Sequence, residues 1–197
     1  MQYLLTPYSE KTEFFAWWEG AFTEEQLNFL QKEARNYQSK ALVGGGVDGR
    51  LDLDYRRSGL SWMPNTPETQ WVFQTLAHVA SSLNAQFFRF NLVGFGENIQ
   101  LTNYDESEKG MYGWHIDFNA NPCSPCRKLS LVVQLSDPVD YEGGVLEIQP
   151  YGKEAIKIRK QRGLIVAFPS WTLHQVTPVT QGNRQSLVSW ITGPAFK

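Results

Sequence analysis

The spacing of apolar residues along this chain changes near Asn84. Before this residue, two segments carry apolar side chains at helical spacing, and an aromatic segment precedes them. After it, short runs rich in Val, Ile, Leu and aromatic residues are separated by Gly, Asn, Asp and Pro at intervals of roughly 8–12 residues, a pattern typical of β-sandwiches and barrels. The pattern predicts helices in the N-terminal part and a sheet structure in the rest.

Two helices are expected. The first begins after Thr23, because Thr23 and Gln26 have the spacing of a capping box. The second begins with Thr66 as the N-cap and Pro67 as the first helical residue, and it ends near Asn84. Each helix has one apolar face, so both are expected to pack against a sheet. Residues 1–20 are expected to form an edge strand or a wrapping segment.

Strands are expected throughout the region that follows. They are placed near residues 86–94, 98–104, 111–118, 127–135, 143–149, 154–159, 163–168, 172–177 and 184–192, with tight turns at 142–144 and 181–183. The strand at 127–135 indicates what each face of the sheet would contact. Its odd positions are all apolar and its even positions are mostly polar, so one face should pack against helices and the other should line a polar cavity. A polar inner wall predicts a ligand site.

These elements predict an α+β, mainly β fold, namely a double-stranded β-helix (jelly-roll) barrel buttressed by N-terminal helices. A chain of 197 residues suits a single domain. Within 1–197, we expect residues 1–85 to form a helical buttress and lid loop, and residues 86–197 to form the jelly-roll catalytic core. The glycine-rich stretch 44–58 is either an ordinary solvent loop or a lid, in which case Arg56 or Arg57 would touch substrate.

Net charge, apolar runs and cysteine content limit the binding partners and the cellular location that we expect. The net charge of −2 argues against a general nucleic-acid or anionic-membrane binder, and neither a long apolar run nor a signal pattern is present, so a cytoplasmic location is expected. The two cysteines, Cys123 and Cys126, lie in a Pro-rich loop. They are too few for a structural zinc site. Two reduced thiols are favoured, with a disulfide clip or an adventitious metal site as alternatives.

Candidate chemistry is concentrated in a few residues. His115 and Asp117 lie two positions apart, so on a strand both side chains leave by the same face. With His174 they form the two-histidine, one-carboxylate set that binds non-haem Fe(II) on one face. Arg184 follows, and its planar fork is the natural partner of a fixed carboxylate. A lone His-x-Asp triplet is more often a surface polar pair, but the distant histidine and arginine favour an iron site.

Several motifs occur in order along residues 104–194. They are Tyr104, Gly110-Met111-Tyr112-Gly113-Trp114-His115-Ile116-Asp117, Arg127-Lys128-Leu129-Ser130, Asp140-Tyr141-Glu142-Gly143-Gly144-Val145-Leu146, Pro169-Ser170-Trp171-Thr172-Leu173-His174 and Arg184 through Trp190. This region resembles the catalytic barrel of the Fe(II)/2-oxoglutarate-dependent oxygenases. Within that superfamily it is similar to the prolyl 4-hydroxylase branch, including the bacterial PKHD-type hydroxylases. The N-terminal half is similar only in general layout.

The resemblance implies a role for the candidate residues at the metal and co-substrate. His115, Asp117 and His174 would bind Fe(II). The co-substrates would be 2-oxoglutarate and O2, and ascorbate is a candidate reductant. Arg184 would pair with the far carboxylate of 2-oxoglutarate. Further hydrogen bonds would come from Tyr104, Ser130 and Ser186. Gln134 stands where related hydroxylases often have a tyrosine, which leaves open how the far carboxylate is completed.

Substrate contacts follow from the same resemblance. Arg127 matches a position that touches substrate, and Trp190 matches a tryptophan that lines the substrate channel. Tyr112 is a third candidate wall. For Trp190 and Tyr112 the alternative is ordinary core packing.

The implied function is a dioxygenase that hydroxylates an unactivated C–H bond, with a prolyl residue of a peptide or protein as the first candidate, and that releases succinate and CO2. The same chemistry on a free amino acid, a lysyl residue or a small metabolite is the alternative, and fold-level analogy does not choose between them. A nucleic-acid demethylase is disfavoured by the mildly acidic chain. A non-catalytic, cupin-like metal-binding module is the alternative of another class, although it would have no use for the carboxylate clamp at Arg184.

Overall fold

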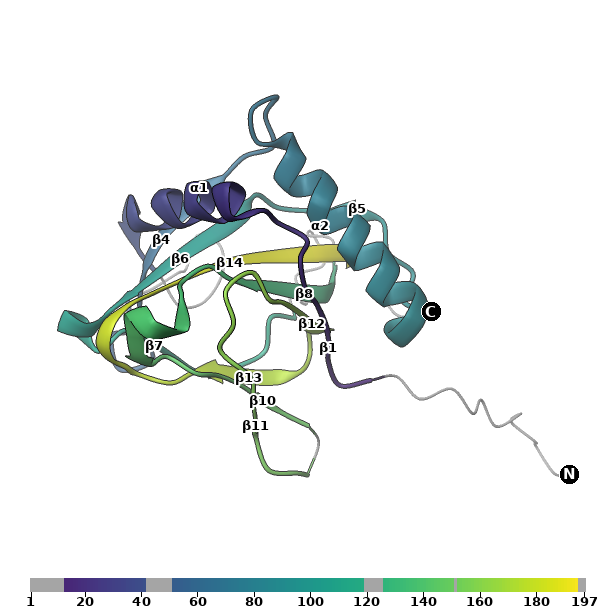
Figure 1. Ribbon diagram of the computed structural model, residues 1–197. Helices are drawn as coiled ribbons and strands as arrows, with labels where there is room; N and C mark the ends of the chain where they lie inside the picture. Colours follow the sequence, from purple (N-terminus) through teal and green to yellow (C-terminus); the bar gives the residue numbers. More distant parts are fainter. Residues whose placement is uncertain (1–12, 42–50, 119–125, 151, 195–197) are drawn as a thin grey trace, which may run out of the picture.

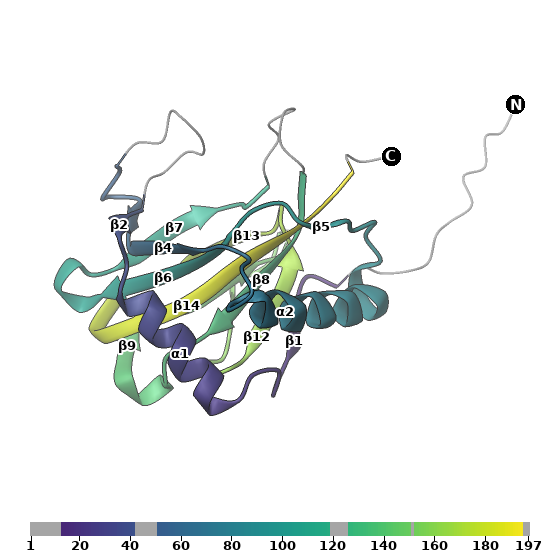
Figure 2. The same ribbon diagram turned by 90° about the horizontal axis from the view of Figure 1, so that it is seen from above.

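The computed structural model describes residues 13–41, 51–118, 126–150 and 152–194. Two antiparallel sheets lie one above the other, and both helices cover the outer face of the larger sheet (Figure 1). Seen from above, the helices cross the strands of this sheet (Figure 2). The arrangement is a jelly roll whose sheets do not close into a continuous barrel, and it confirms the predicted fold class.

The larger sheet has the strand order β1-β12-β8-β14-β6-β4-β2, with β5 and β9 also pairing with β14. The smaller sheet has the order β11-β10-β13-β7-β3. The bounds are β1 Ala16–Trp18, β2 Ser39–Lys40, β3 Arg56–Arg57, β4 Gly59–Met63, β5 Gly94–Phe95, β6 Ile99–Asp105, β7 Met111–His115, β8 Cys126–Gln134, β9 Tyr141–Gly143, β10 Leu146–Gln149, β11 Ile156–Lys157, β12 Ile165–Pro169, β13 Leu173–Val176 and β14 Val179–Gly193. As expected of the aromatic N-terminal segment, β1 forms an edge of the larger sheet.

The helices are α1 (Glu24–Arg35) and α2 (Gln70–Leu83). The capping box that begins α1 is confirmed, because the N–H of Gln26 donates to Thr23 Oγ1 at 3.2 Å and the N–H of Thr23 donates to Gln26 Oε1 at 2.9 Å. The second helix begins later than predicted. Thr69 precedes its first residue and its hydroxyl donates to the carbonyl of Pro64, so the segment predicted as the first turn of the helix folds as a turn ahead of it. Among the helices in the described ranges, none is long and apolar enough to span a bilayer.

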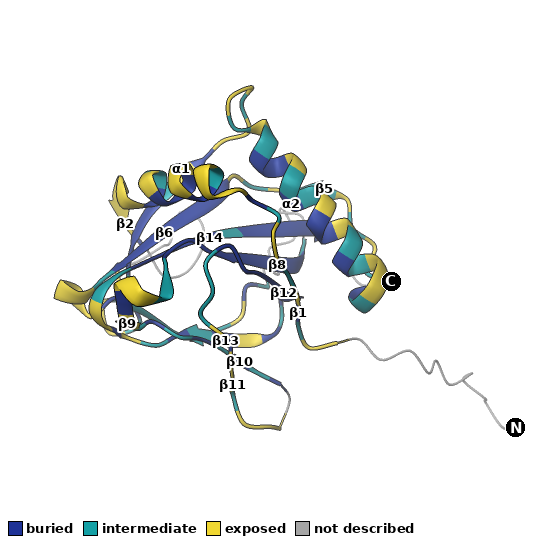
Figure 3. Ribbon diagram, viewed as in Figure 1, coloured by how far each residue is buried: buried dark blue, intermediate teal, exposed yellow. Residues whose placement is uncertain are grey.

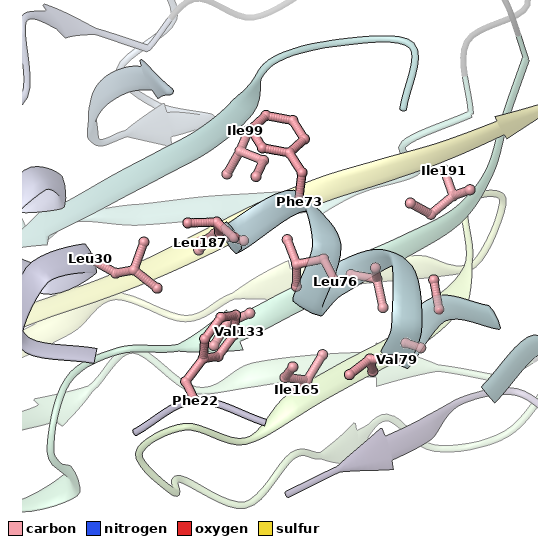
Figure 4. Packing of buried hydrophobic residues seen from close by; sticks show 14 of the residues in the cluster. Phe22, Leu30, Phe73, Leu76, Val79, Ile99, Val133, Ile165, Leu187 and Ile191 are labelled. Carbon is pink, nitrogen blue, oxygen red and sulfur yellow. The ribbon is translucent and has the colours of Figure 1, made fainter. Parts of the chain in front are cut away.

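The alternation along β8 separates two cores. Leu129, Leu131 and Val133 are fully buried on the outer face, where they contact side chains from both helices. Figure 4 shows this packing, with Leu30 of α1 and Leu76 of α2 lying over the strands. The even residues of β8 face the smaller sheet instead, and a second apolar cluster lies between the sheets. The buried colour of the central strands in Figure 3 reflects this covering on both faces.

The prediction of a strand at 86–94 is wrong for most of that range. A π-helical turn, Asn84–Phe88, continues α2, and only Gly94–Phe95 is a strand. The Asn84 side chain bonds both the N–H and the carbonyl of Phe90, and Arg89 adopts a left-handed conformation at φ 56°. Phe88 is buried in the core beneath the helices. The aromatic run in this segment therefore serves helix packing.

The tight turn predicted at 181–183 is also wrong, because these residues lie within β14, where Gln181 and Gly182 pair with β9 and Asn183 pairs with β6. A Cβ at Gly182 would lie 2.0 Å from the carbonyl oxygen of Asp140, and the residue has φ +73°. Glycine is required here for the close approach of β9 and not for a hairpin reversal. The strands β3 and β4 arise in a region without a predicted strand, and β3 brings part of the 44–58 stretch into the smaller sheet. Residues 44–50 of that stretch lie outside the described residues.

Candidate metal and co-substrate site

Three potential metal ligands meet between the two sheets. His115 ends β7 and is paired across the smaller sheet with His174 of β13. One ligand atom from each histidine and one from Asp117 lie within 4.8 Å of one another. The Nε2 atom of His115 is 3.7 Å from Asp117 Oδ1, and that of His174 is 3.6 Å from Asp117 Oδ2. The structure therefore brings together residues that are far apart in the sequence.

Asp117 reaches this position from a loop. The strand β7 ends at His115, so the prediction that both side chains leave one face of a single strand is wrong in detail. The backbone N–H of Asp117 instead donates to the carbonyl of Ser170 at 2.8 Å, and this bond fixes the carboxylate opposite the two rings.

Both histidine rings are oriented by their own chain. His115 Nδ1 lies 2.7 Å from the carbonyl oxygen of Gly113, and His174 Nδ1 lies 2.9 Å from that of Thr172. A carbonyl only accepts, so each Nδ1 carries the proton and each Nε2 presents its lone pair toward the carboxylate. Metal-binding histidines usually donate their other ring N–H in this way, which fixes the tautomer and the orientation of the ring.

The protonation states of His115 and Asp117 match those that a cation requires. Burial, followed by the neighbouring His174, lowers the pKa of His115 to about 3, so its ring is neutral at neutral pH. Burial alone would raise the pKa of Asp117, but the two histidines and a hydrogen bond from Ser130 outweigh it and hold this pKa below its ordinary value. A neutral imidazole and an ionised carboxylate are the forms in which these side chains bind a metal.

Ser130 acts on Asp117 in the structure. Its hydroxyl donates to Asp117 Oδ2 at 2.8 Å and lies 3.0 Å from the hydroxyl of Ser170. The family resemblance places Ser130 at the co-substrate, whereas its contacts make it a support for a candidate metal ligand. Two imidazoles and a supported carboxylate, all buried or half-buried, fit non-haem Fe(II).

A second polar site surrounds Arg184 on β14. The side chain is 1% exposed, and its Nη1 donates to Ser186 Oγ at 3.2 Å. Its Nε and Nη2 atoms are buried without a hydrogen-bond partner in the described structure. The guanidinium carbon lies 5.2 Å from the ring centroid of Tyr104 on the neighbouring strand β6. A buried cation with free donors is costly by itself, and an incoming carboxylate would satisfy it.

Tyr141 and Lys160 complete the surroundings of Arg184, and neither is among the site residues expected from the sequence. Burial raises the pKa of Tyr141, while the charge of Arg184 acts in the opposite direction, so the two groups are neighbours. Lys160 Nζ lies 4.1 Å from the ring centroid of Tyr141, and burial followed by the charge of Arg184 lowers the pKa of Lys160. Two cations and a phenol therefore converge here. The sequence signal for Tyr141 is its position inside the motif that runs from Asp140 to Leu146.

The absence of a side chain at Gly144 leaves space for the side chains of Arg184 and Tyr141. A Cβ at this position would lie 2.9 Å from Arg184 Cδ and 3.2 Å from Tyr141 Cε2. Gln134, by contrast, donates its side-chain N–H to the carbonyl of Arg159 at 2.7 Å. The phenol that the sequence lacks at position 134 is thus present beside Arg184 from a different strand.

The predicted substrate residues lie on both sheets, Tyr112 on β7 of the smaller sheet and Trp190 and Arg127 on β14 and β8 of the larger sheet. Tyr112 stacks on the His115 ring, with 3.5 Å between the ring centroids and 17° between the planes. Trp190 is 6% exposed, and the guanidinium of Arg127 lies 3.7 Å from its ring centroid. Arg127 is held by Glu97 through two hydrogen bonds, of 2.6 and 2.5 Å, and its Nη1 donates to the carbonyl of Asp117 at 3.3 Å. Its contacts therefore fix Trp190 and the Asp117 loop.

Of the two cysteines, Cys126 begins β8 and is a free thiol, while Cys123 lies outside the described residues. The predicted state of the pair stays a prediction.

Known proteins share both the sequence and the fold. A family model described as the 2OG-Fe(II) oxygenase superfamily matches residues 99–192. A PKHD-type hydroxylase of Shewanella sp. (strain MR-4) is 42% identical over 186 residues, covering 87% of this chain and 75% of that protein. A PKHD-type hydroxylase of Synechococcus sp. (strain CC9605) is 48% identical over 82 residues, covering 41% of this chain and 36% of that protein. Relatives such as the Synechococcus protein are thus matched over little more than a third of their own length.

Solved structures show the same fold at low identity. A prolyl-4-hydroxylase of Pseudomonas putida superposes with a TM-score of 0.71 at 17% identity, covering 93% of this chain and 95% of that one. A prolyl hydroxylase from Trichoplax adhaerens, in complex with a hypoxia inducible factor oxygen degradation domain peptide fragment, superposes with a TM-score of 0.72 at 18% identity, covering 91% and 83%. From its motifs, its fold and its 42% identity to relatives matched over three quarters of their length, the chain belongs to the PKHD-type hydroxylases of the 2OG-Fe(II) oxygenase superfamily.

Proposed function

We propose that this protein is an Fe(II)- and 2-oxoglutarate-dependent dioxygenase that hydroxylates a prolyl residue of a peptide or protein. The observation that carries the proposal is the presence, between the same two sheets, of a three-ligand metal site and a buried arginine with two free donor atoms. A metal sensor or structural module would need the first of these and would have no use for the second.

The residues present fit both groups. Nε2 of His115, Nε2 of His174 and the carboxylate of Asp117 would hold the metal. The free donors of Arg184 would receive the far carboxylate of 2-oxoglutarate, with Tyr141 beside it. When iron, 2-oxoglutarate and oxygen are bound, they supply the oxidising chemistry that hydroxylates a C–H bond and yields succinate and CO2.

The protein's own contribution is to position these groups and exclude water. Carbonyl oxygens orient both histidine rings, and Ser130 orients the carboxylate of Asp117. Phe168 packs against His174 with 4.6 Å between the ring centroids, and both side chains are nearly or fully buried. An apolar wall of this kind keeps bulk water from the reacting centre and shields the oxidised C–H from side reactions.

Structures that share this fold support a prolyl substrate. Two of the solved structures with this fold are prolyl hydroxylases, and one of them holds a peptide fragment. Tyr112 and Trp190 would form the apolar walls for the proline ring, one on each sheet. Ascorbate as a reductant and a cytoplasmic location stay predictions.

The test is turnover of 2-oxoglutarate. The protein is loaded anaerobically with Fe(II), 2-oxoglutarate and oxygen are added, and succinate is measured with and without proline-containing peptides. We expect succinate above a metal-free control, loss of this signal in His174→Ala, and one added oxygen atom on the proline of a stimulating peptide. Absence of both 2-oxoglutarate binding and succinate in metal-loaded protein would favour a non-catalytic metal-binding module instead.

A further inference from the structure

A second buried arginine faces the site from the opposite sheet. Across the described ranges, the buried side-chain atoms without a hydrogen-bond partner are Arg56 Nη2, Arg184 Nε and Nη2, and Trp190 Nε1. The proposed function gives a use to Arg184, and Trp190 is a candidate substrate wall. It leaves Arg56 unexplained, although this side chain is only 6% exposed.

Arg56 is connected to the metal ligands through one aromatic ring. It lies on β3 and is paired with Tyr112 of β7. Its guanidinium carbon is 4.2 Å from the centroid of the Tyr112 ring, which stacks on His115. The Nε atom donates to Ser58 Oγ at 3.1 Å, and this bond fixes the plane of the guanidinium while Nη2 stays free. A rigid donor group is thus held one ring away from the candidate iron site.

The charge of Arg56 has no counterion among the residues that the structure describes. Other arginines form ion pairs, Arg127 with Glu97, Arg159 with Glu19 and Arg162 with Glu24. Contact with an aromatic face offsets part of the desolvation of a cation, but a buried charge without an opposite charge still costs stability. Such a group is explained when an anion is bound to it.

Arg57 shows that the inward direction of Arg56 is specific. This neighbouring arginine donates to the carbonyl oxygens of Leu53 and Lys109, so its guanidinium is already bonded to the chain. Alternation along β3 sends one arginine inward and the other outward. Arg184, on the larger sheet, has its own group of neighbours in Tyr141 and Lys160, which are suited to the co-substrate.

We propose that Arg56 binds a carboxylate of the substrate, so that the enzyme selects prolyl substrates that carry a carboxylate near the ring. The inference rests on the proposed function and names its substrate class. The free carboxyl group of a C-terminal prolyl residue and the side chain of an acidic residue next to the proline offer the same chemistry. Either would form the forked, charge-assisted hydrogen bonds for which a guanidinium is suited.

The test is a binding measurement that requires no turnover. Protein loaded with Fe(II) and 2-oxoglutarate under anaerobic conditions is titrated by calorimetry with N-acetylproline and with N-acetylprolinamide, which differ only in the carboxylate. A second pair, acetyl-Gly-Pro-Glu-amide and acetyl-Gly-Pro-Gln-amide, places the carboxylate on a side chain. The wild type is compared with Arg56→Gln and with the matched variant Arg57→Gln.

We expect the acid of one pair to bind at least about tenfold more tightly than its neutral partner, equivalent to about 1.4 kcal/mol. Arg56→Gln should abolish this preference and Arg57→Gln should retain it, and the pair that shows it identifies the source of the carboxylate. Thermal melting of ligand-free Arg56→Gln is expected to match or exceed the wild type, because the variant removes an unpaired buried charge.

Three results would overturn the inference. These are the absence of a preference in both pairs, a preference that survives in Arg56→Gln, and a weakened affinity for 2-oxoglutarate in Arg56→Gln with unchanged binding of the probes. The last would assign Arg56 to the co-substrate. Succinate formation without probes is measured in parallel, so failure of the proposed function appears as absent 2-oxoglutarate turnover, whereas failure of the inference leaves that turnover intact.

Discussion

The two faces of the larger sheet use the same strands for different purposes. On β8, Leu131 is fully buried against the helices, whereas the adjacent Ser130 faces inward and donates to Asp117, a candidate metal ligand. The leucines on the outer face of β8 pack in an apolar core, whereas polar residues on its inner face, such as Ser130, contact charged groups. The difference teaches that stability and chemistry are separated here by one step along a strand, because successive side chains point to opposite faces.

Two arginines extend the contrast. Arg162, on the helix side, bonds to the side chains of Glu24, Asn28 and Gln31 and to the carbonyl of Leu135. Arg184, on the inner face, has two buried donor atoms that remain free. The first arginine links α1 to the sheet, while the second is held ready for a ligand at a cost to the stability of the ligand-free protein.

The largest effect should come from Arg184→Met. Removal of one partner of a buried charged hydrogen bond costs about 2–5 kcal/mol, so we expect the dissociation constant for 2-oxoglutarate to rise by a factor of at least about 30. Metal binding should persist, and the ligand-free variant should be as stable as the wild type or more stable. Calorimetry with 2-oxoglutarate and urea unfolding measure both quantities.

Arg162→Met is the matched control. It should lower the free energy of unfolding and leave the dissociation constant for 2-oxoglutarate unchanged. If both arginine variants changed stability alone, or both changed co-substrate affinity alone, the separation of the two faces would not hold.

Leu131→Ala should have the next largest effect, and on stability. Truncating a fully buried leucine leaves a cavity and typically costs about 2–5 kcal/mol of unfolding free energy. Affinity for metal and 2-oxoglutarate, measured under conditions where the variant is folded, should stay near that of the wild type. A large loss of metal affinity in folded Leu131→Ala would show that the outer core and the site are coupled.

Ser130→Ala should have the smallest of these effects, and on the metal. Loss of a hydrogen bond that supports a metal ligand typically lowers metal affinity by about 10- to 100-fold. Ser61→Ala is the control, since this hydroxyl donates to the carbonyl of Glu33 in α1 and lies outside the metal site. Competition with a chelator measures the affinity, and equal values for both variants would remove Ser130 from the metal site.

Most of the fold was predictable from local patterns. The capping box at Thr23 and the alternation along β8 depend on residues near one another in the chain, and both were confirmed. The segment after Asn84 was misread because a run of aromatic residues suits a strand and a helix–sheet contact equally well. The glycine at position 182 was misread because the need for glycine came from β9, a strand distant in sequence.

The sequence by itself determined the chemical types at the candidate site: two histidines, one carboxylate, an arginine proposed for the co-substrate and the family motifs that contain them. Only the tertiary structure decided that Asp117 is fixed by Ser170, that Tyr141 is the phenol beside Arg184, and that Arg56 and not Arg57 points inward. The physical reason is the range of the interactions. Residue type and alternation are local properties, whereas a hydrogen-bond partner from another strand, or the inward face of a strand of two residues, exists only once the sheets have formed.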